Sequence, residues 1–370
     1  MEKRIDDILA AAAAAEPADM DWGSLTFGYY PTDYNVRCEY KDGKWGDIEV
    51  SDSVTLPIHM AATCLHYGQE AFEGLKAFRG KDGKTRVFRM EKNAERFRSS
   101  AEGIKMEPLP LEKFCEMVRL VVRLNKRFVP PYGSGASLYI RPLEIGTTAA
   151  VGVKPASEYM VVMFVSPVGP YFKTGFKPSK ICISRNYDRV APKGTGRFKI
   201  GGNYAASLAS GELAHAKGYS AMLYIDPKDK LYLDECGPAN FFGILDGKYV
   251  TPKSDSILPS ITNLSLRMRT SEISIRLASD DSILKRHRPT TSAASDFLPQ
   301  RIALIRHLLC LTALTKNLLS LHELFLRYNP RMLTLDNNLF ILWYCYGMLP
   351  SNADTFTPMP HNSSIIHFLF

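Results

Sequence analysis

Three Asp-Gly dipeptides stand between segments rich in apolar and β-branched residues, and they constrain the fold more than any other feature of the chain. They lie in "CEYKDGKWGDIEV", "KAFRGKDGKTRVFRM" and "NFFGILDGKYVTP". An Asp-Gly pair flanked in this way favours a tight hairpin, because both central residues of its turn need a positive φ. The three segments therefore predict antiparallel hairpins.

Further strands and helices follow from the side-chain patterns. "ASLYIRPLEIG" and "EYMVVMFVSPVG" are rich in β-branched and aromatic residues and predict strands. "LEKFCEMVRLVVRL" repeats apolar side chains at helical spacing. We expect a helix in "KNAERFRSSAEG", capped near Asn93 and ended by Gly103, and another in "NYAASLASGELAHAKGY", entered at Asn203 and ended by Gly218. Hairpins with interspersed helices predict an α+β fold.

The length of the chain predicts two domains. Its 370 residues exceed the size at which one hydrophobic core usually keeps growing. The segment "SPVGPYFKTGFKPSK" is rich in Pro and Gly and is the best linker candidate. We therefore predict a small N-terminal α/β domain over residues 1–165, a linker over 166–176, and the start of a larger second domain over 177–263.

The composition of the chain changes near residue 264. Of its 25 glycines only Gly347 follows Asn263, and the only glutamates beyond that point are Glu272 and Glu323. Leu, Ser and Arg are frequent there, but the residues that form turns are scarce. Our hypothesis is that residues 264–370 form an atypical tail produced by a shift of reading frame, which leaves the second domain incomplete.

Charge and cysteine usage restrict the partners and the compartment. The net charge of +8 suits anionic small molecules, and the absence of a dense Lys/Arg block argues against nucleic acid. The seven cysteines are scattered without a CxxC pair, as in a protein with reduced thiols. The N-terminus lacks the order of a signal peptide, and the longest apolar run, "FILWYCYGML", is too short to span a bilayer. We expect a soluble cytoplasmic protein with small-molecule substrates, no metal, and neither a nucleic-acid nor a membrane partner.

The segment "GRFKIGGNYAAS" contains a lysine in an unusual setting. Lys199 lies between Phe198 and Ile200, and two glycines follow. In an apolar environment the pKa of a lysine can fall, and the neutral amine can then attack a carbonyl to form a Schiff base. Tyr204 follows five residues later and can donate a hydrogen bond to the same ligand. Taken alone, a strand end followed by a glycine turn explains the segment equally well.

Two later segments offer partners for a phosphorylated ring. In "YLDECGPANFFGI", Glu235 ends an apolar strand and could face a protonated ring nitrogen, as pyridoxal phosphate requires. "DSILPSITN" predicts a turn and a helix start, where the amides of Ile261 and Thr262 could bind a phosphate. The alternatives are an exposed strand end and an ordinary capped helix.

Several residues of the first domain could line the same site. Arg96 in "NAERFRSS" could bind phosphate through two N–H groups, or it could simply be solvated on a helix face. Tyr139 and Arg141 in "LYIRP" share one face of a strand. Tyr67 and Phe72 flank a glycine in "HYGQEAFEGL", although aromatic residues like these usually belong to a core.

Taken in order, these segments resemble the branched-chain amino acid aminotransferases, which are fold-type IV pyridoxal phosphate enzymes of the class IV aminotransferases. The resemblance runs from about Phe27 to Asn263 and does not extend into the tail. It is carried by "FGYYPTDYN", "FEGLKAFRG", "NAERF", "LYIRP", "GPYF", "FKIGGNYAASL", "YLDECGPANFFGI" and "SILPSITN". It implies a two-domain fold like that of D-amino acid aminotransferase, with a second domain that the atypical tail leaves incomplete.

The resemblance also assigns a role to each candidate residue. Lys199 resembles the lysine that binds pyridoxal 5′-phosphate covalently, Tyr204 the partner of its 3′-oxygen, and Glu235 the partner of its ring nitrogen. Arg96 and the amides of Ile261 and Thr262 resemble its phosphate site. The residues that resemble the walls of the substrate pocket are Phe27, Tyr67, Phe72, Tyr139, Arg141 and Tyr171.

The implied reaction is a transamination in two halves. Lys199 would act as general base and acid while the amino group of leucine, isoleucine or valine passes to the cofactor, and 2-oxoglutarate would then accept that amino group to give glutamate. The family also implies a homodimer. Another fold-type IV enzyme, such as a D-amino acid aminotransferase or aminodeoxychorismate lyase, remains an alternative. So does an inactive product, because the Gly-Thr-Ala type turn expected after "SILPSITN" is not found.

Overall fold

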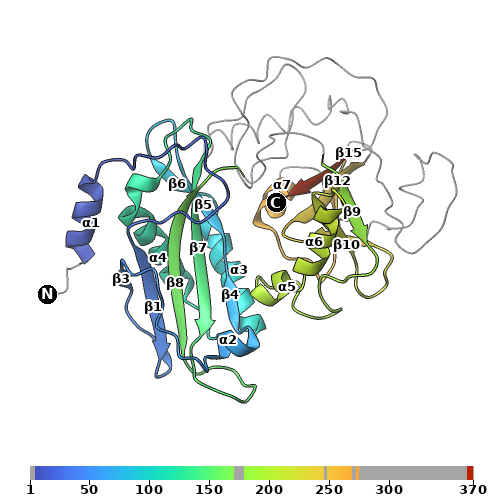
Figure 1. The fold of residues 1–370 in the computed structure, drawn as a ribbon, viewed down its shortest axis with the longest axis horizontal. Helices are drawn as coiled ribbons and strands as arrows, with labels where there is room; N and C mark the ends of the chain where they lie inside the picture. Colours follow the sequence, from blue (N-terminus) through green and yellow to red (C-terminus); the bar gives the residue numbers. More distant parts are fainter. Residues whose placement is uncertain (1–4, 171–178, 246–247, 269–271, 275–364, 370) are drawn as a thin grey trace.

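The computed structural model describes residues 5–170, 179–245, 248–268, 272–274 and 365–369. Figure 1 shows two lobes, each built around its own β-sheet, with α5 (Gly201–Ala205) between them. The mixture of sheets and helices confirms the predicted α+β class.

The first lobe is built on an eight-stranded antiparallel sheet. Its main order is β2-β1-β8-β7-β5-β6, with β3 paired to β1 and β4 paired to β7. Its strands are β1 (Asn35–Lys41), β2 (Lys44–Trp45), β3 (Glu49–Ser51), β4 (Glu70–Phe72), β5 (Leu75–Arg79), β6 (Thr85–Val87), β7 (Ser137–Gly146) and β8 (Tyr159–Val168).

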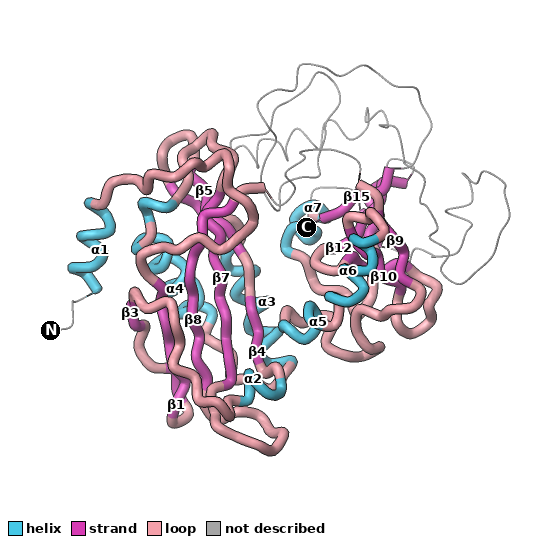
Figure 2. The backbone as a smooth tube through the Cα atoms, in the orientation of Figure 1, coloured by secondary structure: helices cyan, strands magenta, loops and turns pink. Residues whose placement is uncertain are grey.

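Helices pack against one face of this sheet and leave the other face to the site. α4 (Leu111–Leu124) buries its apolar stripe against the sheet, while α3 (Met90–Gly103) packs beside it. The other helical segments of this lobe are α1 (Ile5–Ala14), α2 (Thr63–Tyr67) and the 3-10 turn η1 (Lys126–Phe128). Figure 2 shows α1 at the outer side of this lobe, apart from the strands. On β7, Leu138 and Ile140 join this core. Because side chains alternate along a strand, the residues between them point to the opposite face.

The second lobe contains a smaller mixed sheet of order β14-β13-β12-β11-β10-β9, with β15 paired to β12. β9 and β10 are parallel, and α5 and α6 lie between them in the chain. Its elements are β9 (Ile181–Ser184), α6 (Leu208–Ala216), β10 (Ala221–Ile225), β11 (Leu233–Cys236), β12 (Asn240–Leu245), β13 (Lys248–Thr251), α7 (Ile261–Arg267), β14 (Glu272–Ser274) and β15 (Ile365–Leu369).

The segment around Lys199 is held against the first lobe by backbone contacts. The amide of Phe72 donates to the Lys199 carbonyl at 3.0 Å, and the Lys199 amide donates to Ser100 Oγ at 2.9 Å. Ala71 and Ile200 form an isolated β-bridge. The lysine therefore lies where β4 and α3 of one lobe meet α5 of the other (Figure 1).

The predicted hairpins form, but their turns differ. Asp42 and Gly43 both have a positive φ, as the first Asp-Gly turn requires. In the second hairpin, between β5 and β6, Gly83 has a positive φ and the loop is longer. Strands β12 and β13 pair as expected, while their connecting residues 246–247 lie outside the described residues.

Two predicted helix starts are wrong. α3 begins at Met90, so Asn93 lies inside the helix, where its amide donates to Glu73 Oε2 at 2.8 Å. α5 begins at Gly201, so Asn203 is internal and donates to the Thr195 carbonyl. Both side-chain amides serve partners outside their own helix, which local capping rules do not reveal.

The structure describes only the first part of the expected linker. β8 extends to Val168, which is three residues into the expected linker over 166–176, and residues 171–178 lie outside the described part. In the tail, only residues 264–268, 272–274 and 365–369 are described. Among the described residues no helix is both long and apolar enough to cross a bilayer. No cluster of His, Cys, Asp or Glu in those residues is placed to hold a metal ion.

Candidate active site

Lys199 is partly buried at the start of α5 and faces aromatic side chains. Its Nζ donates to Tyr204 Oη at 2.8 Å and lies 4.5 Å from the centre of the Phe72 ring. Burial, followed by the positive charge of Arg96, lowers the pKa of Lys199 to about 8. This amine therefore loses its proton much more readily than a solvated lysine, which is the property that a Schiff-base lysine needs.

Tyr204 remains a neutral phenol in this environment. Burial, together with the negative charge of Glu235, raises its pKa to about 12. Its ring packs edge-on against Phe72, with the ring centres 5.0 Å apart. The hydroxyl is therefore fixed beside Lys199 and is able to donate a hydrogen bond to an anionic oxygen.

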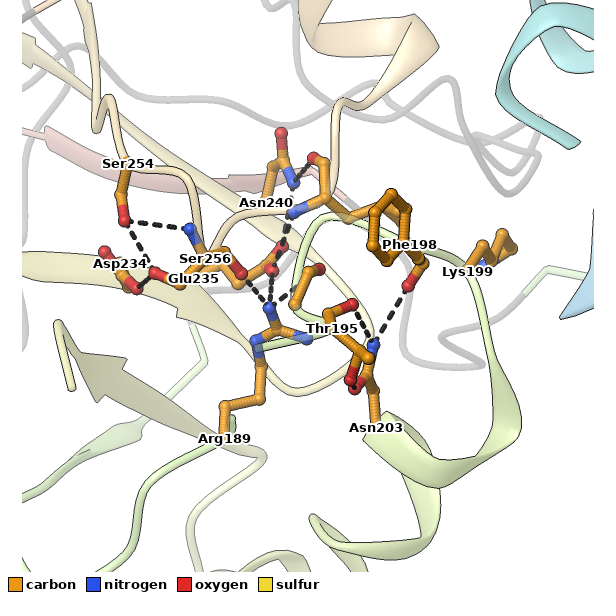
Figure 3. Close-up of polar contacts among 12 residues, drawn as sticks. Arg189, Thr195, Phe198, Lys199, Asn203, Asp234, Glu235, Asn240, Ser254 and Ser256 are labelled. Atoms are coloured by element: carbon orange, nitrogen blue, oxygen red, sulfur yellow. Dashed lines mark hydrogen bonds and ion pairs between the residues drawn. The ribbon is translucent and has the colours of Figure 1, made fainter. Parts of the chain in front are cut away.

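Glu235 on β11 is buried in the second lobe with polar partners on both carboxylate oxygens (Figure 3). Oε1 accepts from the Leu258 amide at 3.0 Å, and Oε2 accepts from Asn240 Nδ2 at 2.9 Å. Arg189 Nη2 lies 2.7 Å from Oε1. Burial raises the pKa of Glu235 to about 7, although Arg189 opposes that rise. The ionised form of this carboxyl group suits a protonated ring nitrogen.

Arg96 on α3 reaches from the first lobe to the second. Its Nη1 donates to the Pro259 carbonyl at 3.0 Å. Pro259 lies directly before Ser260, whose Oγ caps α7 by accepting from the Asn263 amide at 3.1 Å. The guanidinium therefore stands next to the helix start that contains Ile261 and Thr262, as expected for residues that share one anion.

Aromatic and charged side chains from β4, β7 and the loop before β1 gather near Lys199. The rings of Phe27 and Tyr139 pack edge-to-face with centres 5.2 Å apart. Arg141 donates from Nη2 to Tyr139 Oη at 3.2 Å, and its Cζ lies 5.0 Å from the centre of the Phe72 ring. The structure thus brings together four of the six residues predicted to line the substrate pocket.

Of the remaining two pocket residues, Tyr67 has its described contacts elsewhere. Tyr67, at the end of α2, is 39% exposed and donates to the Val151 carbonyl, and its described contacts are away from Lys199. Tyr171 lies outside the described residues. Their assignment to the pocket remains a prediction.

Sequence patterns did not single out three buried residues of the site, which are Glu73, Arg189 and Asn240. Glu73 is fully buried and contacts Arg96, and it stands in the quoted segment "FEGLKAFRG" directly after Phe72. An acidic residue between apolar strand segments was a usable signal. Arg189 occurs in "NYDRVAPKG", which resembles an ordinary solvated loop, so no local signal marks it.

The donor set fits pyridoxal phosphate. Among the described residues Glu235 Oε1 has two close partners and Oε2 has one, so within that part of the chain a lone pair on Oε2 is left for a ring N–H. An amine of lowered pKa, a neutral phenol beside it, and an arginine next to a helix start supply the other contacts that such a cofactor requires.

Comparisons with known proteins agree with this chemistry. The family model described as amino-transferase class IV matches residues 70–276. A branched-chain-amino-acid aminotransferase of Haemophilus influenzae is 49% identical over 254 residues, covering 67% of this chain and 74% of the relative. One from Helicobacter pylori is 44% identical over 256 residues, covering 69% of this chain and 75% of that protein.

Solved structures show the same fold. A crystal structure of the Escherichia coli branched-chain amino acid aminotransferase superposes with a TM-score of 0.57 at 25% identity, covering 68% of this chain and 80% of that chain. A branched-chain aminotransferase from the thermophilic archaeon Thermoproteus uzoniensis, solved with norvaline, gives 0.52 at 22% identity, covering 66% and 78%. The family match and the two bacterial relatives show that this chain belongs to the class IV aminotransferases.

Proposed function

We propose that this protein transfers amino groups from leucine, isoleucine and valine to 2-oxoglutarate, using pyridoxal phosphate bound at Lys199. The observation that carries the proposal is the Lys199 amine, with its pKa lowered to about 8 and its Nζ 2.8 Å from Tyr204 Oη. The names of the relatives from Haemophilus influenzae and Helicobacter pylori support the reaction and the substrate class.

Each part of the cofactor has a proposed partner. Lys199 would hold its aldehyde carbon, Tyr204 its 3′-oxygen and Glu235 its ring nitrogen. Arg96 and the amides of Ile261 and Thr262 would bind the phosphate. When bound, the ring supplies an electron sink that lowers the barrier to removing a proton from the substrate α-carbon.

The side chains around Lys199 explain how the proton is handled. With a pKa near 8, a useful share of Lys199 is a free amine at neutral pH, so its Nζ can take a proton at the substrate α-carbon and later return one. Tyr204 and Phe72 pack about this amine and restrict water. Arg141 provides a cation that can orient a substrate carboxylate.

The aromatic walls favour a branched apolar side chain. Phe27, Phe72 and Tyr139 present ring faces and edges beside the charged Arg141. Such a pocket suits leucine, isoleucine and valine by apolar contact, while Arg141 offers a charge for the second carboxylate of glutamate or 2-oxoglutarate. The predicted pocket roles of Tyr67 and Tyr171 belong to the same proposal.

We further propose that the protein is a cytoplasmic homodimer. Met60, Leu65, Val151 and Val153 are apolar, well exposed, and lie at the end of the first lobe near Tyr67. Such a patch is typical of an interface between subunits. The cysteines in the described part of the chain are unpaired, which suits a reducing compartment.

The domain division and the origin of the tail remain proposals as well. The two sheets support domains on either side of a linker near 166–176. The match to the family model stops at residue 276, close to the change in composition at 264. That coincidence favours the second candidate, an inactive product whose tail 264–370 comes from a shifted reading frame. Sequencing the locus tests this directly, and an uninterrupted frame would contradict it.

A substrate panel on the full chain tests the main proposal. Purified protein with added pyridoxal phosphate is given 2-oxoglutarate and either L-leucine or D-alanine, and glutamate is measured. We expect glutamate from L-leucine only, and none with Lys199→Met. Activity on D-alanine alone would support another fold-type IV enzyme, while no activity and no cofactor uptake would support the inactive product.

A further inference from the structure

Arg189 is a buried cation to which neither the sequence patterns nor the resemblance gives a role. It lies in the loop between β9 and α5 and is only 7% exposed. Arginine is rarely buried to this degree unless its charge is paired. Among the described residues its Nε has no hydrogen-bond partner, and its described contacts run through Nη2. Its surroundings therefore indicate its purpose (Figure 3).

The Arg189 guanidinium connects three segments that are far apart in the sequence. Its Nη2 donates to the Gly196 carbonyl at 3.1 Å and to the Ser256 carbonyl, and lies 2.7 Å from Glu235 Oε1. Gly196 stands three residues before Lys199, and Ser256 precedes the start of α7. Each segment thus contains one proposed cofactor contact, to the aldehyde, the ring nitrogen or the phosphate.

Gly196 leaves the space that this arrangement needs. A Cβ at residue 196 would overlap the Ser256 carbonyl oxygen and lie only 2.8 Å from Arg189 Nη2. Any larger residue would therefore push the segment of Lys199 away from that of Ser256. The close approach of the two segments depends on a glycine at this position.

The contacts to Glu235 also decide which of its lone pairs remains available. Oε1 is occupied by Arg189 and the Leu258 amide, whereas Oε2 accepts only from Asn240 among the described residues. The Asn240 amide is itself oriented, because its Oδ1 accepts from Asn263 Nδ2 at 3.1 Å. The Arg189–Glu235 ion pair and the Asn240–Asn263 hydrogen bond together hold the Glu235 carboxylate in one orientation. In that orientation one lone pair of Oε2 is left for a ligand.

Charge is the second contribution of Arg189. The charged and titratable groups that interact electrostatically with Glu235 are Arg189 from the loop, its strand neighbours Asp234 and Cys236, and Tyr204 from α5. Of these, Arg189 is the group that favours the ionised carboxylate, while burial and Asp234 oppose it. Without Arg189, Glu235 would take up a proton and could no longer attract a protonated ring nitrogen.

We propose that Arg189 is a positioning residue that joins the segments carrying Lys199, Glu235 and the phosphate site, and that keeps the Glu235 carboxylate ionised and oriented toward the cofactor nitrogen. The part about the cofactor rests on the proposed function. The pairing of Arg189 with Glu235 does not, and it can be measured in protein without cofactor.

The first experiment uses the full chain without cofactor. Thermal unfolding midpoints are measured from about pH 6 to about pH 9 for the wild type, Arg189→Met, Glu235→Gln and the double variant. The folded-state pKa of Glu235 is raised to about 7 from 4.5, so the stability that protonated Glu235 contributes to the wild type is lost as the pH rises to about 7. In Arg189→Met this loss continues to higher pH, and the gap from the wild type widens by at least ~2 °C.

Glu235→Gln should remove that widening in the double variant, because no carboxylate remains to titrate. Arg127→Met is the control, since Arg127 forms a two-pronged ion pair with Asp33 on the surface of the first lobe. The unfolding midpoint of Arg127→Met should differ from that of the wild type by the same amount at every pH. The proposal would be overturned if the difference in unfolding midpoint between Arg189→Met and the wild type were constant with pH and unaffected by Glu235→Gln.

The second experiment measures the affinity for pyridoxal 5′-phosphate by absorbance titration. Arg189→Met should weaken binding by at least ~30-fold, the scale of losing one partner from a buried charge pair, while Arg127→Met leaves it within ~2-fold. Arg189→Lys keeps the charge but is shorter and lacks the planar guanidinium whose Nη2 reaches Glu235, Gly196 and Ser256 together. It should therefore retain the wild-type pH profile and still lose affinity. This variant decides the question if Arg189→Met does not fold.

The outcomes separate the two proposals. If the wild type takes up no pyridoxal phosphate, the proposed function fails, and the cofactor-free pH comparison still decides whether Arg189 controls Glu235. If the wild type binds but Arg189→Lys binds equally well, the positioning role is wrong and the proposed function stands.

Discussion

Both carboxylate oxygens of Glu73 contact the Arg96 guanidinium, with Oε1 2.6 Å from Nε and Oε2 2.9 Å from Nη2. Glu73 has no exposed surface and also accepts from Asn93 Nδ2 at 2.8 Å and from the Gly74 amide at 3.0 Å. Burial by itself raises the pKa of this carboxyl, but Arg96, then Lys199 and Asn93, hold it below its usual value. The pair fixes Arg96 with Nη1 directed to the second lobe.

Replacing Glu73 with Gln should therefore weaken the phosphate site. The amide keeps the size of the side chain but removes the charge that orients Arg96, so we expect the affinity for pyridoxal phosphate to fall ~10-fold or more. Glu95→Gln is the matched control, because Glu95 lies on α3 next to Arg96 and forms an exposed ion pair with Lys92. It should leave affinity unchanged and stability within ~0.5 kcal/mol. Equal affinities for the two variants would contradict the role of Glu73.

Lys199 should react as an amine of low pKa. In cofactor-free protein, labelling with an amine-selective reagent at increasing pH should show Lys199 half-reactive near pH 8, because its pKa is lowered to about 8. The exposed Lys41 is the reference, because its hydrogen bond to Glu39 raises its pKa and it should react only at higher pH. Peptide mass spectrometry gives both profiles from one sample. If Lys199 follows the same profile as Lys41, the lowered pKa is wrong.

Two glycines near Lys199 should respond differently to the same substitution. Gly196→Ala forces its new methyl group against the Ser256 carbonyl and should cost about 1–3 kcal/mol of folding free energy. Gly202→Ala has open space and lies within α5, so it should be neutral or slightly stabilising. Chemical denaturation of both variants compares them directly. A stable Gly196→Ala variant would contradict the close approach of these segments.

The exposed apolar patch should control the oligomeric state. Val151→Asp and Val153→Asp place charges among well-exposed apolar residues and should convert a dimer to a monomer in light scattering. Val54→Asp is the control, since Val54 is 73% exposed in a different loop. A wild type that is monomeric, or a dimer indifferent to all three changes, would rule out this interface.

The resemblance to the branched-chain aminotransferases brought Lys199, Tyr204, Glu235 and Arg96 together in one predicted site. The structure places Tyr204 beside Lys199 and Arg96 beside the start of α7, and the roles of these residues stay predictions. The hydroxyl of Tyr67 contacts the Val151 carbonyl, and its place in the pocket stays a prediction.

What could not be predicted depends on contacts between distant residues. Arg189 and Ser256 are 67 residues apart, and Glu73 and Arg96 are 23 residues apart, so no local pattern marks either pair. Asn93 and Asn203 failed as helix caps for the same reason, because their amides serve partners across the fold or in the preceding loop. The hairpins and the α4 stripe were predictable since local turn chemistry and periodicity fix them.

The most direct test is to locate the cofactor on the full chain. Protein incubated with pyridoxal 5′-phosphate is reduced with borohydride, digested and analysed by mass spectrometry. We predict one stable phosphopyridoxyl group, on the peptide that contains Lys199, and its loss in Lys199→Met. Unmodified Lys199, or labelling spread over surface lysines, would contradict the assignment of this chain as a working pyridoxal phosphate enzyme.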